Sequence, residues 1–285
     1  MNNSRPQTIQ IFLPDGNPRG VRIAEITNRT VKAILFPRKQ FDYMLTRSEL
    51  SNVGFYFLFG ESEIGKPLCY IGEAEDCAVR LSQHQRNKDF WIYAVVIISK
   101  TNAFTKSHIK FLEHISIKKA QEVNRWQLEN GVNTSKPFVT ESMEADMLDC
   151  FETAKVLLST LGFPLFDSVS RDNNNIHEEV YKMKSKEAIA EGNLIDEGFV
   201  IYKGSKAVKE TLPSCHKYMI DLRNKLIDNG TLSLDGNVYV FTEDYIFSSP
   251  STAGGVISGR PTNGWTSWKN ANGKTLDEIK RENLV

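Results

Sequence analysis

The chain has 285 residues, of which 40% are hydrophobic and 25% charged, and its formal net charge is zero. This length accommodates two domains, and the composition is that of an ordinary globular protein. Zero net charge argues against a protein that simply coats nucleic acid. No apolar run approaches membrane-spanning length, so we expect no membrane association.

Cysteine usage and the N-terminal residues indicate a cytoplasmic protein. The four cysteines include no CxxC pair, so neither a zinc knuckle nor a redox motif is indicated. We expect reduced thiols, partly buried in cores. The first residues also lack the apolar segment of a secretory signal.

Residues 1–50 are predicted to form a small β-rich module. Strands are predicted at 7–13, 21–26 and 31–36, where apolar residues dominate or alternate, and a short helix at 37–50. A segment of this length does not readily build a core of its own. We therefore expect it to pack on a neighbour or to bind a partner.

The stretch that follows reads as a β-hairpin with a loose turn. Two apolar runs, Val53–Phe59 and Leu68–Ile71, flank a polar connection that contains glycine. Each run carries a tyrosine close to a glycine, Tyr56 in the first and Tyr70 in the second. Glycine allows close approach by a backbone or a ligand, and a phenol can donate or accept a hydrogen bond. Two hydroxyls on neighbouring strands are thus predicted to face one site.

A helix is predicted directly after the hairpin. Glu75 or Asp76 can begin it, since carboxylates favour the positive end of a helix. Arg80 and His84 are four residues apart, so they share one face of that helix.

A buried strand and a second helix come next. The strand Trp91–Ser99 is almost wholly apolar, which predicts a central position covered on both faces. The helix runs from about residue 105 to 122 and carries Glu113 in its middle. Asn130 lies shortly after this helix. Strand, strand, helix, strand, helix over residues 51–135 predicts a mixed α/β fold of one sheet with covering helices.

The order of these residues resembles the GIY-YIG nuclease family. The features that carry the resemblance are the hairpin tyrosines, Arg-x-x-x-His, a mid-helix glutamate and a later asparagine. The resemblance covers roughly residues 52–130, with Phe55 in place of the isoleucine. It implies a small sheet flanked by helices over residues 51–165 and a DNA endonuclease that uses Mg²⁺ or Mn²⁺. The site residues that it implies are Tyr56, Tyr70, Arg80, His84, Glu113 and Asn130.

The resemblance also assigns roles within that site. Glu113 becomes the metal ligand, and one carboxylate suits Mg²⁺, which keeps several waters. Arg80 would hold the scissile phosphate through its planar guanidinium. Tyr56 would be the general base, activated by Arg80, the metal or His84, because a free phenol is a poor base at neutral pH. Tyr70 would bond the phosphate or the attacking water, and Asn130 would shape the site or contact the phosphate.

Each of these residues taken singly has an ordinary structural explanation. Strand tyrosines usually pack in a core, an arginine often pairs on the surface, and a glutamate in an amphipathic helix is often solvated. Residues 76–125 carry nine Lys/Arg against four Asp/Glu, as a phosphate-binding surface requires, but solvated helix faces give the same excess. A catalytically inactive nucleic-acid-binding or assembly protein on a nuclease scaffold is therefore the alternative. We find no Gly-rich phosphate loop or Ser-His-Asp order that would indicate a small-molecule enzyme.

The C-terminal part is predicted as a linker over 166–195 and an α+β domain over 196–285. A helix at 141–161 precedes them, and 247–268 reads as loop-rich. This part resembles a domain of uncharacterised function often found behind GIY-YIG nucleases, and a module of restriction–modification enzymes. The sequence allows either a protein or a nucleic acid as the partner of this domain. Trp265 and Trp268 either stack on an exposed base or belong to the core of this domain.

Overall fold

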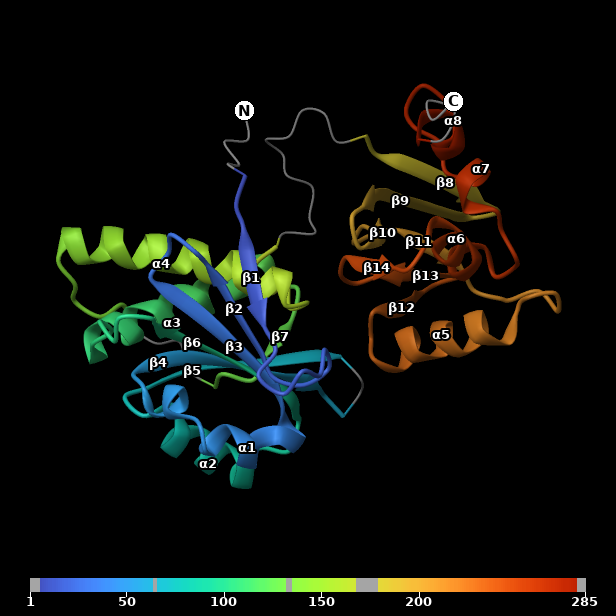
Figure 1. The fold of residues 1–285 in the computed structure, drawn as a ribbon. Helices are drawn as coiled ribbons and strands as arrows, with labels where there is room; N and C mark the ends of the chain where they lie inside the picture. The colour runs from blue at the N-terminus through green and yellow to red at the C-terminus, as the bar shows by residue number, and fades with distance from the viewer. Residues whose placement is uncertain (1–5, 64–65, 132–134, 168–178, 281–285) are drawn as a thin grey trace. The chain divides into compact units, whose positions relative to one another are not determined.

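The computed structural model describes residues 6–63, 66–131, 135–167 and 179–280. The chain divides into two compact units, Met1–Ser168 and Val169–Val285 (Figure 1). Helices and strands are mixed in both, so the predicted mixed α/β class is confirmed. The predicted linker at 166–195 lies partly outside the described residues, since 168–178 are among those not described.

The N-terminal unit is built on one sheet, in the order β1-β2-β3-β6-β4-β5-β7 over the described ranges. Neighbouring strands are antiparallel, except that β5 and β7 run parallel. The strands are β1 (Ile9–Phe12), β2 (Arg22–Ile26), β3 (Val31–Pro37), β4 (Gly54–Glu61), β5 (Pro67–Ala74), β6 (Trp91–Ser99) and β7 (Gln127–Leu128).

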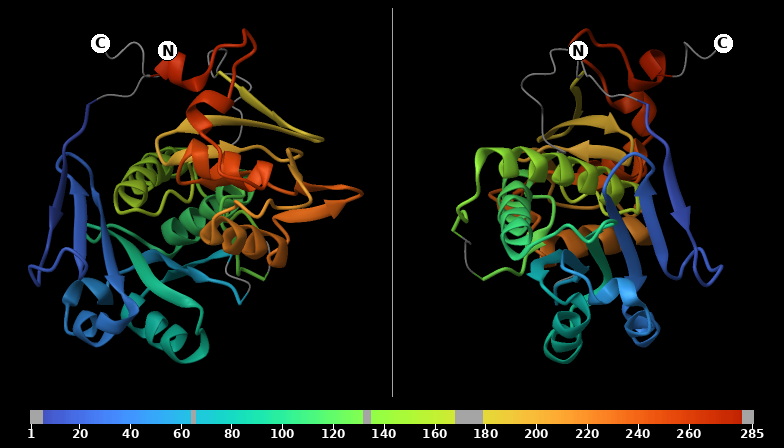
Figure 2. Two further views of the ribbon diagram at one scale, coloured as in Figure 1. Left: turned by 90° about the vertical axis from the view of Figure 1, so that its right-hand side faces the viewer. Right: turned by 60° about the vertical axis from the view of Figure 1, so that its left-hand side comes forward.

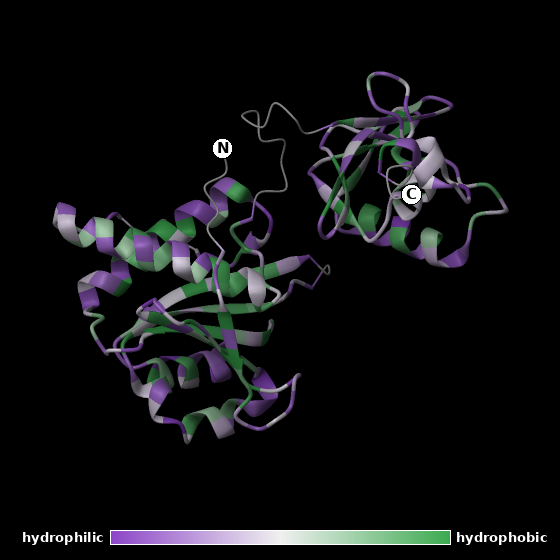
Figure 3. Cartoon of the chain, turned by 45° about the horizontal axis from the view of Figure 1, so that its top comes forward, coloured by the Kyte–Doolittle hydropathy of each residue, from purple (hydrophilic) through white to green (hydrophobic). Residues whose placement is uncertain are grey.

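Helices cover both faces of this sheet (Figure 2). One face packs against α3 (Lys106–Val123) and α4 (Glu141–Thr160). The other packs against α1 (Phe41–Leu45) and α2 (Cys77–Asn87). The apolar β6 lies between β3 and β4, as its composition predicts. In Figure 3 the strands are largely green, whereas the helices alternate between green and purple, as expected when helices bury one side.

Residues 1–50 do not stand apart as a separate module in the structure. β3 pairs with β6 along its whole length, from Val31 opposite Ser99 to Pro37 opposite Tyr93. The first three strands therefore extend the sheet that carries the hairpin, within the same unit. In place of the predicted helix at 37–50, the structure has the shorter helix α1, flanked by 3-10 turns at Arg38–Gln40 and Ser48–Ser51.

The C-terminal unit has two small sheets among its described residues, ordered β14-β10-β9-β8 and β11-β13-β12. Its core includes the fully buried Trp268 and Phe199, whose ring centroids are 4.6 Å apart. The elements are β8 (Tyr181–Ser185), β9 (Ala188–Ile195), β10 (Gly198–Ile201), β11 (Lys206–Val208), α5 (Lys217–Asp228), β12 (Leu232–Asp235), β13 (Val238–Phe241), β14 (Tyr245–Phe247), α6 (Pro250–Ser258), α7 (Gly264–Ser267) and α8 (Leu276–Lys280).

Two parts of this unit differ from the prediction. β8 and β9 form a hairpin within the segment predicted as linker, so the sheets of the C-terminal unit include residues before 196. The helix α6 lies within the segment predicted to be loop-rich. Its first turn is stabilised by Ser249, whose hydroxyl accepts a hydrogen bond from the amide of Thr252, and by a proline in the first turn.

Candidate active site

The hairpin of β4 and β5 places two phenols on one face of the sheet. Tyr56 lies directly opposite Gly72 in the strand register. A Cβ atom at Gly72 would lie 2.4 Å from the hydroxyl oxygen of Tyr56, so only glycine leaves room for that phenol. The ring of Tyr70 lies 6.3 Å from that of Tyr56, centroid to centroid.

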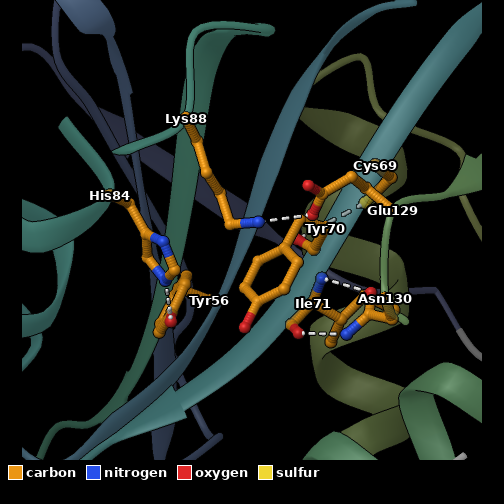
Figure 4. A network of polar contacts seen from close by, with 8 residues as sticks. All are labelled: Tyr56, Cys69, Tyr70, Ile71, His84, Lys88, Glu129 and Asn130. Carbon is orange, nitrogen blue, oxygen red and sulfur yellow. Dashed lines mark hydrogen bonds and ion pairs between the residues drawn. The ribbon is translucent and has the colours of Figure 1, made fainter. Parts of the chain in front are cut away.

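The helix α2 brings Arg80 and His84 to this face. Asp76 begins the helix, and its side chain accepts a hydrogen bond from the amide of Val79 at 3.0 Å. His84 lies one turn beyond Arg80, and its Nε2 atom is 2.7 Å from the hydroxyl oxygen of Tyr56 (Figure 4). The His84 ring also meets the Tyr70 ring edge-on, with centroids 5.0 Å apart.

Burial keeps this pair neutral. The side chain of Tyr56 has no exposed surface and His84 is 5% exposed. Burial raises the pKa of Tyr56 strongly, with Tyr70 adding to the shift and Arg80 opposing it. Burial, with the charges of Arg80 and Lys88, lowers the pKa of His84 to about 4. The imidazole is therefore neutral at pH 7, and one of its nitrogens can accept the phenol proton.

Arg80 is the accessible cation of the group. Its side chain is exposed at the surface, and its Nη1 donates to Gln83 at 2.8 Å. Partial burial lowers the pKa of Arg80, but hydrogen bonding to the Tyr56 hydroxyl and attraction to Tyr56 and Tyr70 outweigh it, so the net shift is upward. The guanidinium thus lies beside both phenols while remaining open to a ligand.

Asn130 acts on the strand rather than on the phenols. Its Oδ1 accepts from the Ile71 amide at 3.0 Å, and its Nδ2 donates to the Ile71 carbonyl at 2.7 Å. The side-chain amide thereby substitutes for a neighbouring strand where β7 has ended, because β7 pairs only with Leu68 and Cys69. Asn130 thus fixes the backbone of β5 next to Tyr70, and its expected role in the site stays a prediction.

Glu113 lies on α3, which packs on the face of the sheet opposite the one that carries the phenols. α3 packs on the face of β5 that carries Ile71, and Glu113 is half-buried. Burial, then the neighbouring carboxylate of Glu73, raises the pKa of Glu113 to about 7, against the opposing charges of Lys106 and Arg80. Arg80 is therefore close enough to act on both Tyr56 and Glu113. Of the six expected residues, the structure gathers Tyr56, Tyr70, Arg80 and His84 on one face of the hairpin, whereas Asn130 bonds the backbone of β5 and Glu113 lies on α3.

Two neighbouring carboxylates, Glu113 and Glu73, could hold a divalent cation that keeps several of its waters. Across the ranges that the structure describes, no group of three or more His, Cys, Asp or Glu is placed to hold a metal ion. Glu113 and Glu73 are two carboxylates close enough to raise the pKa of Glu113. Mg²⁺ is often held by one or two carboxylates, waters and substrate phosphate, so Glu113 and Glu73 are the residues that could hold such an ion, and the metal itself stays a prediction.

Four charged residues near the site were not predicted. Lys106 pairs with Glu73 at 2.8 Å, and Lys88 pairs with Glu129 at 2.5 Å. Lys88 follows His84 by four residues and Arg80 by eight, so helical spacing could have identified it. Glu73 lies two residues after Ile71 on β5, so strand alternation puts both side chains on the sheet face that α3 covers. This spacing could have identified Glu73.

Several other sequence features have structural roles. Trp268 is buried and donates its indole N–H to the Pro250 carbonyl at 3.0 Å, so it belongs to the core. His108 accepts a hydrogen bond from the Thr105 amide at the start of α3. The four cysteines are buried free thiols. None of the helices described has the length and apolar character needed to cross a bilayer.

Comparison with known protein families gives one match, and it lies within the C-terminal unit. Residues 181–280 match a family model described as a domain of unknown function (DUF4357), which agrees with the resemblance noted for this part of the chain. The match begins at the first residue of β8. No curated protein and no solved structure matches the chain.

Proposed function

We propose that the N-terminal unit is a metal-dependent endonuclease that hydrolyses phosphodiester bonds in DNA. The observation that carries this proposal is the gathering of Tyr56, Tyr70, Arg80 and His84 on one face of a hairpin, with Glu113 close enough for Arg80 to act on its pKa. Phosphodiester hydrolysis needs an activated water, a group that stabilises charge on the phosphate, and help for the leaving oxygen. These side chains supply groups for each task.

Arg80 holds the scissile phosphate in this mechanism. Its guanidinium is exposed and charged, and it can donate two parallel hydrogen bonds to phosphate oxygens. The half-buried Tyr70 lies at the same surface and donates its hydroxyl to the phosphate or to the attacking water. The excess of basic residues over 76–125 favours the approach of a polyanion.

Tyr56 and His84 move the proton. The Tyr56 hydroxyl orients the attacking water and takes its proton, while the neutral His84 accepts the proton of the phenol. Since Tyr56 has no exposed surface, this step requires the side chains packed around its hydroxyl to move so that water reaches it. The glycine at position 72 keeps the phenol in register with His84.

Glu113 is the residue that would hold Mg²⁺ or Mn²⁺, with Glu73 beside it. When bound, such an ion supplies positive charge at the phosphate and at the leaving oxygen. The carboxylate must be ionised to bind a cation, and its pKa of about 7 makes metal affinity rise between pH 6 and 8.

The wider role follows the same proposal. We place the enzyme in the cytoplasm, in phage defence, restriction, repair or mobile-element transfer. The C-terminal unit would read the target or bind a protein or nucleic-acid partner.

The test is incubation of the purified full chain with plasmid DNA and Mg²⁺ or Mn²⁺ at pH 8. We expect nicking or cutting by the wild type. We expect a loss of at least about 100-fold in Glu113→Ala, since even outer-shell partners of metal sites contribute about 10–100-fold. Glu122→Gln, on the same helix, is the matched control and should cut normally. Equal inactivity of the wild type and Glu113→Ala on many DNA substrates would refute the proposal.

The burial of Tyr56 favours a second candidate, a nucleic-acid-binding or assembly protein that has lost hydrolysis. This candidate predicts that the wild type binds duplex or single-stranded DNA without cutting it. It also predicts no difference in Mn²⁺ binding between the wild type and Glu113→Gln by electron paramagnetic resonance.

A further inference from the structure

An ion pair between Lys88 and Glu129 lies against the ring of Tyr70. Lys88, which ends α2, places its Nζ atom 4.3 Å from the centroid of the Tyr70 ring. The same ammonium lies 2.5 Å from Oε2 of Glu129. Figure 4 shows the Lys88 side chain reaching across Tyr70 to Glu129.

The backbone on either side of Tyr70 is held by the same short segment. The Glu129 amide donates to the Cys69 carbonyl at 2.8 Å, and Asn130 bonds both backbone groups of Ile71. Residues 129 and 130 therefore fix the residues before and after Tyr70. Lys88 adds a contact to the ring itself, so the phenol is constrained at both its backbone and its side chain.

Lys88 is poorly placed to act as a phosphate ligand. Its side chain is 19% exposed, and its charge is already paired with Glu129. A cation over an aromatic face is attracted by the negative face of the ring, and the anion of Glu129 holds the cation there. Lys88 and Glu129 carry opposite charges, so the pair has no net charge.

We propose that Lys88 and Glu129 form a positioning pair that holds the Tyr70 phenol in its working orientation. This inference rests on the proposed function for its catalytic part, since Tyr70 is the half-buried phenol assigned to the phosphate or the water. Neither member of the pair touches the reacting atoms. Misplacement of a catalytic group by about 1 Å can cost about 100-fold in rate, so the pair matters to turnover.

The first experiment observes the ring without any reaction. In the full chain labelled with ¹³C at tyrosine ring carbons, the Tyr70 resonance is assigned by its loss in Tyr70→Phe. We expect Lys88→Met and Glu129→Gln each to shift that resonance, and Lys88→Arg to restore it largely, because arginine keeps both the charge and the aromatic contact. Lys119→Met, which removes an exposed lysine of α3, is the control. An unchanged Tyr70 resonance in Lys88→Met would overturn the inference, whatever the activity.

The second experiment measures DNA cleavage by the same variants. We expect kcat to fall about 10- to 100-fold in Lys88→Met with KM nearly unchanged, and Lys88→Arg to recover most of it. The double variant Lys88→Met/Glu129→Gln should be no slower than Lys88→Met, since the two residues act as a unit.

Two outcomes separate the possible failures. A raised KM with unchanged kcat, and a salt slope reduced by about one, would assign Lys88 to phosphate binding and overturn the positioning role. A wild type that cuts no DNA, with the Tyr70 resonance still moved by Lys88→Met, would refute the proposed function and support the placement of the phenol by Lys88.

Discussion

Replacement of Glu113 by glutamine should stabilise the N-terminal unit at alkaline pH. The pKa of Glu113 is raised from 4.5 to about 7, first by burial and then by Glu73. The folded chain thus keeps a proton that the unfolded chain releases between pH 4.5 and 7. Ionised Glu113 therefore lowers the free energy of unfolding. The whole of this loss is present above pH 7, and none of it is present below pH 4.5.

The size of the effect follows from the pKa values. A change from 4.5 to about 7 corresponds to about 3 kcal/mol, at about 1.4 kcal/mol for each pKa unit. Because Glu113 is only half-buried, solvent screening reduces this value. We expect Glu113→Gln to raise the free energy of unfolding by about 1–3 kcal/mol at pH 8 and by roughly zero at pH 4.5.

The assay is urea denaturation of the wild type and the variant from pH 4.5 to 8, with EDTA present. Tryptophan fluorescence follows the unfolding of both units, and Trp91 and Trp126 are its reporters in this one. Glu122→Gln, an exposed position on the same helix, should show no such pH-dependent difference. A Glu113→Gln variant that is equally or less stable than the wild type at pH 8 would refute the electrostatic account of this carboxylate.

Three further changes test the packing and charge of the site. Gly72→Ala should destabilise the unit by about 1–3 kcal/mol, because its Cβ would meet the Tyr56 hydroxyl; urea denaturation measures this. Asn130→Ala should lower the free energy of unfolding by about 1–3 kcal/mol and speed hydrogen exchange of the Ile71 amide, which loses its acceptor. As pH falls from 6.5 to about 4, the wild type should lose stability, because His84 binds a proton in the unfolded chain but not in the folded chain. His84→Gln should remove this loss, which urea denaturation across the same pH range measures.

Controls and contrary results for these three changes are specific. Gly131→Ala places its Cβ where no atom lies within 4 Å, so its effect should be small, and an equal effect at Gly72 would contradict the packing argument. Unchanged exchange at Ile71 in Asn130→Ala would contradict the bridging role of the amide. A His84→Gln variant with the same acid sensitivity as the wild type would show that His84 is not the group that resists protonation.

Local pattern predicted the elements that carry the site. The Tyr56 and Tyr70 strands pair as a hairpin, Asp76 begins the helix that carries Arg80 and His84, and Glu113 lies within α3. These features depend on alternation, capping and helical spacing over short distances, which sequence alone displays.

Long-range pairing and tertiary ion pairs were not accessible in the same way. β3 pairs with β6 across some sixty residues of chain, and nothing in the local pattern of residues 31–37 distinguishes this pairing from a separate module. Lys88 and Glu129 meet only because α2 and the segment after α3 flank the same strand. The helix at Pro250–Ser258 was missed because its glycines and serines resemble a loop, although its Ser-Pro start is a helix signal.

The most direct test of the central claim is a crystal structure of the full chain with Mn²⁺ and a phosphorothioate DNA duplex. We predict an anomalous peak about 2.0–2.2 Å from a carboxylate oxygen of Glu113, with a DNA phosphate bonded to Arg80 and to the Tyr70 hydroxyl. A manganese peak elsewhere, or a DNA phosphate that contacts neither Arg80 nor Tyr70, would contradict the assignment of these side chains to a hydrolytic site.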